Sequence, residues 1–165
     1  MGSRNRYLVN CFILCIPVLA WNFLLANSLP DAFKEEIFWK EIPVIITYGE
    51  HLFRALFFLV IFLMPLDKNM HRQKRAGWLL YGVGLCAYFL SWLTLIYYPE
   101  SSWAKSLPGF TAPAWTPAIW MTGMSYISNR FSFDIPFRRW IVISFFIMFL
   151  LFHNLHTYIV FLRLH

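Results

Sequence analysis

Charged side chains are scarce in this sequence. Asp, Glu, Lys and Arg make up 13% of the 165 residues, whereas hydrophobic residues make up 59% and aromatic residues 21%. Soluble domains typically carry about 25% charged residues. A soluble chain of this size could not bury so much apolar surface, so we expect much of that surface to face lipid. The composition excludes an ordinary soluble domain and predicts an integral membrane protein.

Several signatures of soluble chemistry are also missing. The sequence has no internal repeat, no low-complexity tract, no glycine-rich phosphate loop and no G-x-S-x-G motif. Its three cysteines, Cys11, Cys15 and Cys86, have neither zinc-ribbon nor thioredoxin spacing. We therefore expect them to act as small apolar core residues. The net charge of +6 lies in short basic clusters between apolar runs, which favours loops of a membrane protein over a nucleic-acid partner.

Apolar runs divide the chain into up to five membrane spans, since a helix needs about 20 apolar residues to cross a bilayer. The runs cover roughly 7–29, 43–65, 78–98, 113–133 and 140–162. Prolines and small residues interrupt the fourth run, so four spans plus a re-entrant segment is the alternative. The sequence predicts an all-α, polytopic helical bundle that forms a single transmembrane domain over 1–165.

Basic residues predict how this bundle is oriented. They gather at 4–6, 68–75 and 130–139, whereas 30–41 is net acidic and 99–113 carries one Lys and one Glu. With five spans, all three basic clusters fall on one side. The positive-inside rule then places the N-terminus in the cytoplasm and the C-terminus outside. We expect a plasma membrane, such as a bacterial inner membrane.

The second apolar run holds Glu50, His51 and Arg54 within five consecutive positions. At 1.5 Å per residue, Glu50 lies about 10 Å inside the outer boundary and Arg54 about 16 Å inside. Charged groups at such depths cost at least about 2.5–3.5 kcal/mol each, so they should face the bundle interior. Glu50 and Arg54 share a helix face at a spacing of four, and Tyr48 continues the polar wedge outward.

The fifth run holds a second polar group in "FHNLHTY", residues 152–158. From a cytoplasmic start near residue 140, His153 and His156 lie about 20 and 24 Å up the helix, in the outer half of the membrane. That is the depth of Glu50. We therefore predict one site, with a side-chain atom of His153 or His156 within about 6 Å of Glu50, His51 or Arg54.

Three interpretations of this site stay open. The polar residues can act only as glue between helices. They can instead bind or transform a small amphiphile, with Glu50, His51, His153 and His156 as candidate catalytic acid–base groups. The expected substrate-binding residues are then Arg54, Tyr48, Asn154, Thr157, Trp115 and Thr116, with Arg54 holding an anionic head. Thirdly, the histidines and Glu50 can bind a metal or haem, although Arg54 would repel a cation.

Two loop segments are expected to border the outer end of the bundle. The stretch 106–120 has three prolines and one glycine, which predicts irregular chain until a helix starts at Pro117 with Thr116 as its N-cap. Its tryptophans suit an aromatic belt or a stiff cap over the site. The segment 31–41 has apolar residues at helical spacing and predicts an interfacial amphipathic helix.

These observations favour a small multi-pass membrane protein with an outward-facing polar pocket between the second and fifth spans. We expect it to bind or process a small amphiphile, such as a lipid, quinone or isoprenoid. The alternatives are a non-catalytic membrane subunit or scaffold, and a metal- or haem-binding membrane protein. The sequence identifies no cofactor and leaves open whether the protein is an enzyme. An oligomer or a partner subunit is compatible with it.

Overall fold

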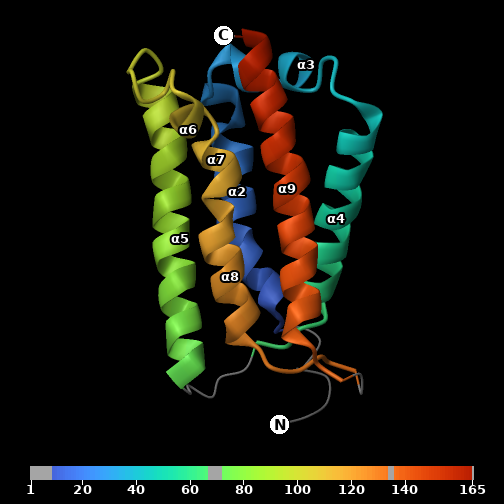
Figure 1. The fold of residues 1–165 in the computed structure, drawn as a ribbon. Coiled ribbons are helices and arrows are strands. Elements are labelled where there is room, and N and C mark those ends of the chain that lie inside the picture. Colours follow the sequence, from blue (N-terminus) through green and yellow to red (C-terminus); the bar gives the residue numbers. More distant parts are fainter. Residues whose placement is uncertain (1–8, 67–71, 134–135, 165) are drawn as a thin grey trace.

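The computed structural model describes residues 9–66, 72–133 and 136–164, and its regular elements are helices (Figure 1). The long helices are α4 (Val44–Phe62), α5 (Arg72–Tyr97) and α9 (Arg139–Leu164). Helix α2 (Ile16–Leu25) continues from the 3₁₀ turn η1 (Cys11–Cys15) into η2 (Ala26–Ser28). The shorter elements are η3 (Asp31–Phe33), α3 (Glu35–Phe38), α6 (Leu107–Phe110), α7 (Ala112–Trp115) and α8 (Pro117–Ile127).

Within the described ranges, four helices are long and apolar enough to cross a membrane. They are Cys11–Ser28, Val44–Phe62, Gln73–Tyr97 and Arg139–Leu164. Large apolar side chains on their outer faces stay exposed, such as Phe23 at 85% and Ile45 at 75%. The predicted all-helical fold is confirmed, and the four long apolar helices with their outward apolar surface are compatible with an integral membrane protein.

The expected fourth span, 113–133, forms a chain of short helices instead of one long helix. Pro108, Pro113 and Pro117 each occupy one of the first two positions of α6, α7 and α8. Proline is tolerated there but cannot continue a preceding helix without losing a hydrogen bond. Figure 1 shows α6, α7 and α8 descending in turn from the end of the bundle that carries α3 toward the opposite end.

This segment differs from the sequence expectation in one respect. We expected irregular chain before Pro117, but α6 and α7 are already helical. Helix α8 does begin at Pro117 with Thr116 at the N-cap position, as predicted, but Thr116 has a helical backbone (φ −58°, ψ −30°) and its side chain caps no amide. Its hydroxyl donates to the carbonyl of Ala112 at 2.7 Å. The chain was already turning helically when it reached Thr116, so the first amide groups of α8 needed no side-chain cap.

Glycines let α8 approach α5 closely. A Cβ atom at Gly84 of α5 would collide with the backbone of Trp120, and one at Gly123 of α8 would collide with the backbones of Gly77 and Tyr81. Small residues at such crossings bring helix backbones together in membrane bundles. The pair α4 and α9 uses the same device, because a Cβ at Gly49 would lie 2.5 Å from the ring of Phe152.

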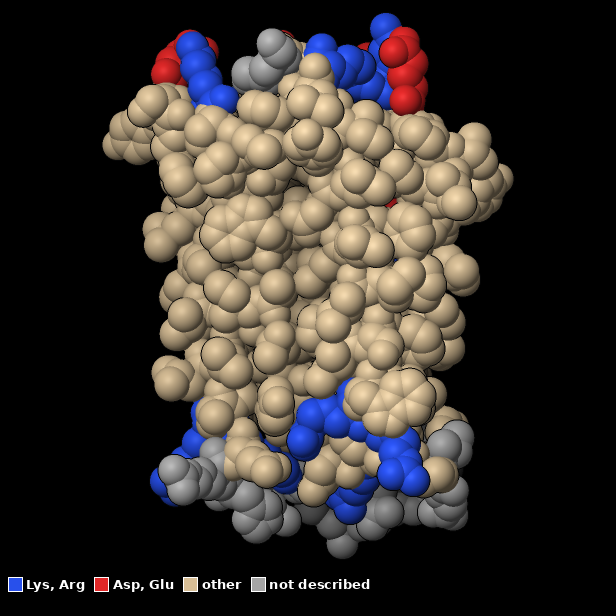
Figure 2. Space-filling model, in the orientation of Figure 1, with Lys and Arg blue, Asp and Glu red and all other residues tan. Residues whose placement is uncertain are grey.

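Charged residues gather at the two ends of the molecule and leave an apolar belt between them (Figure 2). In this view, the charged side chains coloured at one end belong to Lys and Arg, and those at the other end are acidic and basic together. At the second end, the expected amphipathic helix over 31–41 is wrong. The segment forms only one 3₁₀ turn and the four-residue α3. It is held to α9, because Arg163 donates to the carbonyls of Ile37 and Lys40.

The cysteines divide between core and surface. Cys11 and Cys15 are buried, as expected for small apolar residues. Cys86 is exposed on α5, so its predicted core position is wrong. All three are free thiols.

Candidate functional site

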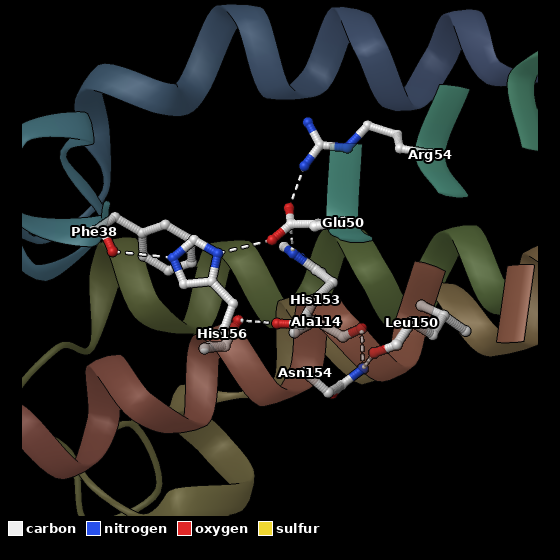
Figure 3. Close-up of polar contacts among 9 residues, drawn as sticks. Phe38, Glu50, Arg54, Ala114, Leu150, His153, Asn154 and His156 are labelled. Atoms are coloured by element: carbon white, nitrogen blue, oxygen red, sulfur yellow. Dashed lines mark hydrogen bonds and ion pairs between the residues drawn. The ribbon is translucent and has the colours of Figure 1, made fainter. Parts of the chain in front are cut away.

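Glu50 is the centre of a polar cluster inside the bundle (Figure 3). Its side chain is 1% exposed and accepts from Arg54, one turn further along α4. From α9, Nδ1 of His153 lies 3.1 Å from Oε1 of Glu50, and Nδ1 of His156 lies 2.7 Å from Oε2. The predicted proximity between the α9 histidines and the polar group of the second span is confirmed. The three partners compensate the loss of water around a buried carboxylate.

His156 joins three elements through one imidazole ring. The residue is fully buried, with Nδ1 facing Glu50 of α4 and Nε2 lying 3.0 Å from the carbonyl oxygen of Phe38 in α3. The ring also packs against the rings of Phe38 and Trp39, with centroids 4.2 and 4.4 Å away. His156 therefore couples the carboxylate to the segment that covers the end of the bundle.

Two adjoining cavities lie beside this cluster. The first has a volume of about 250 Å³ and the second about 220 Å³. Both are lined by Asn22, Tyr88, Pro113 and His153, so they meet at these four residues. Arg54 lines the first cavity only. The second reaches the covering segment, where Phe33 and Phe38 line it.

The position of the cavities corrects part of the sequence expectation. We expected a pocket between the second and fifth spans. The walls instead include residues of η1, α2, α5, α7 and α8 as well as of α4 and α9. Where α4 and α9 face each other directly, Gly49 and Phe152 leave no room for a cavity. The open volume therefore lies toward the centre of the bundle, on the far side of the Glu50 contacts.

Two hydrogen-bond donors beside the first cavity lack acceptors. Arg54 Nε and Trp120 Nε1 are buried, and neither has a hydrogen-bond partner among the residues that the structure describes. Both residues line the first cavity. Tyr88 differs, because its hydroxyl donates to Oδ1 of Asn22 at 2.6 Å. Buried unpaired donors are uncommon in folded proteins, and these two are available to an acceptor group in the cavity.

Two predicted site residues lie outside the cluster. His51 is exposed and stacks on Trp39, with ring centroids 5.0 Å apart. Tyr48 is 72% exposed on the outer face of α4. Neither residue lines either cavity. The helix geometry explains this, because one residue turns the side chain by about 100° and moves His51 away from the direction of Glu50.

The other predicted binding residues have varied surroundings. Thr157 lines the second cavity, and its hydroxyl donates to the carbonyl of His153. Asn154 donates to the carbonyls of Ala114 and Leu150 and so ties α9 to α7. Trp115 is 41% exposed and donates to the carbonyl of Pro108. Thr116 is buried without lining either cavity.

Sequence reasoning missed three residues of the site. Tyr88 lies in the middle of an apolar span, and its hydroxyl was a usable signal, because a buried Tyr normally finds a polar partner. Trp120 was expected in an aromatic belt or in a cap over the site, but it is 3% exposed inside the bundle. The contribution of Phe38 is a backbone carbonyl, which no residue type reveals.

The part of the chain that the structure describes offers no set of side chains that could bind a metal ion. There, no group of three or more His, Cys, Asp or Glu side chains has an arrangement that could hold a metal ion. The Glu50 oxygens and the Nδ1 atoms of His153 and His156 are turned toward one another. His51, the third expected imidazole ligand, stacks against Trp39.

Comparisons of this chain with models of protein families, with curated proteins and with solved structures found no match.

Proposed function

We propose that this chain is a small multi-pass membrane protein whose intramembrane polar pocket binds a small amphiphile, such as a lipid, a quinone or an isoprenoid. The observation that carries the proposal is the pairing of two cavities with the Glu50 cluster through Arg54 and His153. Most of the wall is apolar, and a few polar groups converge at one place. That combination is typical of small-molecule sites.

The pocket combines parts suited to the two ends of an amphiphile. Arg54 and the indole N–H of Trp120 supply donors for a polar head, and Val18, Phe58 and Met121 supply apolar wall for a chain. His153 lies between the cavities and the Glu50 carboxylate. If the protein transforms its ligand, His153 is the residue placed to move a proton, which assigns the predicted catalytic role to it ahead of His51.

A non-catalytic scaffold is the second candidate, and specific contacts favour it too. Glu50, His156 and Asn154 each join different elements through hydrogen bonds. Polar side chains in membrane bundles often have only this role. Such a protein could act as a partner subunit or form an oligomer. The two interpretations differ in whether the cavities hold a ligand.

Filling the first cavity tests the proposal. The protein is purified in mild detergent, and the amphiphiles that copurify are extracted and counted by mass spectrometry. We expect a stoichiometric amphiphile with the natural chain and its loss in Val18→Trp, because the indole would occupy the cavity. Val83→Trp makes the same change on the exposed face of α5 and should keep the amphiphile. A Val18→Trp protein that folds and retains the full complement would contradict the proposal, as would a natural chain without any.

The membrane arrangement is part of the same proposal. We propose five crossings, with the segment α6–α8 as a composite fourth one, the N-terminus in the cytoplasm and the C-terminus outside. The gathering of Lys and Arg at one end supports this orientation through the positive-inside rule. The basic residues at 4–6 and Lys68 lie outside the described ranges. The expected location is a plasma membrane, such as a bacterial inner membrane.

A further inference from the structure

The hydrogen bonds of His156 locate a proton inside the bundle. Its Nε2 faces the carbonyl oxygen of Phe38, and its Nδ1 faces Oε2 of Glu50. A carbonyl only accepts, so Nε2 carries a hydrogen. The contact at Nδ1 then needs a second hydrogen, either on the imidazole or on the carboxyl group. In both arrangements, the Glu50–His156 pair holds one proton more than a carboxylate and a neutral imidazole, and its net charge is zero.

The cluster as a whole therefore carries a net positive charge. Arg54 keeps its proton in proteins and adds one positive charge to the neutral Glu50–His156 pair. A neutral His153 with its hydrogen on Nδ1 completes the hydrogen bonds of the carboxylate. The other titratable groups that line the cavities are Cys15 from η1 and Tyr88 from α5. Arg54 contacts Glu50, but the extra proton of the Glu50–His156 pair already balances that carboxylate, so the cluster keeps one positive charge in excess. Among the described residues, no Asp or Glu lines either cavity.

The uncompensated charge faces a space with unused donors. Arg54 Nε and Trp120 Nε1 have no acceptor among the described residues, and both residues line the first cavity. The rest of that wall is largely apolar. An excess positive charge beside such a wall is costly unless an anion accompanies it. An acceptor-rich anionic group would satisfy both the charge and the donors.

We infer that the ligand of the proposed pocket is a monoanionic amphiphile, with its head group at Arg54 and its chain along the apolar wall. This inference deepens the proposed function and rests on it. A monoanion makes the cluster neutral, whereas a neutral amphiphile leaves its excess positive charge unbalanced and a cationic one adds to that charge. A small free anion shares the head-group chemistry but leaves the apolar volume unfilled.

Matched amphiphiles that differ only in their head group test the inference. The full chain in non-ionic detergent is titrated with dodecanoate, dodecanol and dodecyltrimethylammonium, and native mass spectrometry counts the bound molecules. We expect one dodecanoate per chain, bound at least about ten-fold more tightly than the other two, since hydrogen bonds to charged groups reach that size. Acetate at the same concentration should not displace it.

Two variants locate the head group. Arg54→Gln should weaken dodecanoate at least about ten-fold and leave dodecanol unchanged, because only the anion uses the guanidinium. Lys105→Gln removes one positive charge at an exposed site and should change neither affinity. If Arg54→Gln is too unstable to purify, the double variant Glu50→Gln/Arg54→Gln removes the two paired charges together. It should also lose the preference for dodecanoate over dodecanol.

The binding outcomes separate the inference from the proposed function. Equal affinity for all three dodecyl compounds would overturn the monoanion and leave an amphiphile pocket in place. Displacement of dodecanoate by an equal concentration of acetate would show a small-anion site and overturn the amphiphilic part. Failure of every dodecyl compound, together with no copurifying amphiphile, would overturn both.

The extra proton of the Glu50–His156 pair can be detected directly in the natural chain. In protein labelled with ¹⁵N-histidine, NMR assigned with His156→Gln should show hydrogens on both ring nitrogens of His156. The alternative arrangement gives an infrared band of a protonated carboxyl group that disappears in Glu50→Gln. Either signal at neutral pH supports the charge count. The absence of both would overturn it.

Discussion

At the residue scale, the contacts of Glu50 explain how an apolar helix holds an acid and a guanidinium so close together. The carboxylate is 1% exposed and contacts Arg54, His153 and His156. Arg54 differs, because its side chain is 34% exposed and its charge also lies over the ring of Phe149. Glu50 is therefore the common partner of three groups, whereas the charge of Arg54 has other favourable surroundings.

We predict that Glu50 and Arg54 are energetically coupled. Glu50→Gln should destabilise the protein by about 3 kcal/mol, because it removes the buried carboxylate that Arg54, His153 and His156 all contact. Arg54→Gln should cost less, since the histidines still contact Glu50 and Arg54 is partly exposed. The double variant should cost less than the sum of the two. Thermal unfolding in detergent, followed by tryptophan fluorescence, measures all three.

The exposed pair Glu100 and Lys105 provides the control for this set of single and double variants. Both side chains are more than half exposed, so the corresponding Gln variants should leave the unfolding temperature nearly unchanged. Strictly additive losses for Glu50→Gln and Arg54→Gln would show that the two residues act independently.

At the scale of helices, the close contact between α5 and α8 depends on glycines, which have no side chain. Gly123 of α8 faces the backbones of Gly77 and Tyr81 on α5. Backbone atoms cannot move aside cheaply, so even one methyl group would push the helices apart. Gly82, one residue after Tyr81, has no atom within 4 Å of the position that its Cβ would take.

We predict opposite effects for the same substitution at these two glycines. Gly123→Ala should destabilise the protein by about 1–3 kcal/mol through overpacking. Gly82→Ala should be neutral or stabilise it by up to about 1 kcal/mol, because alanine favours the helix and meets no neighbour. The thermal midpoints of both variants, measured in the same detergent, check this. Equal shifts would mean that α5 and α8 do not pack through Gly123.

At the scale of the whole molecule, an apolar belt separates two charged ends (Figure 2). The segment α6–α8 decides how the ends relate to the membrane. If it crosses as a composite helix, the loop at Ser102 and the loop at Asn129 lie on opposite sides. If it is re-entrant, both loops lie on the same side. The predicted orientation also places Asn69 inside the cell, but that residue lies outside the described ranges.

Cysteine labelling in intact cells distinguishes the two arrangements. An impermeant thiol reagent should label Ser102→Cys from outside and should reach Asn129→Cys only after the cells are opened. The background carries Cys86→Ser, since Cys86 is the exposed native thiol among the three. Labelling of both positions from outside would favour four spans with a re-entrant segment. Labelling of Asn129→Cys alone would reverse the orientation.

The sequence by itself was enough to predict an all-helical fold with membrane-length apolar helices and the proximity of an α9 histidine to the polar group of the second span. Run length and composition specify membrane helices because lipid cannot hydrogen-bond an exposed backbone. Depth then predicted the contact, because polar groups at one level of a small bundle must turn away from lipid. Neither argument requires knowledge of which helices are neighbours. The roles proposed for these residues in binding or catalysis stay predictions.

Only the tertiary structure decided which polar residues share the cavities and what covers them. Depth and spacing could not exclude His51 from the site. A turn of about 100° separates an inward side chain from an outward one, and only the neighbouring helices determine which direction is inward. Nor could they pair His156 with the carbonyl of Phe38, 118 residues away in the chain. A backbone carbonyl is the same group in every residue, so its partner depends on how the chain packs and not on the local sequence.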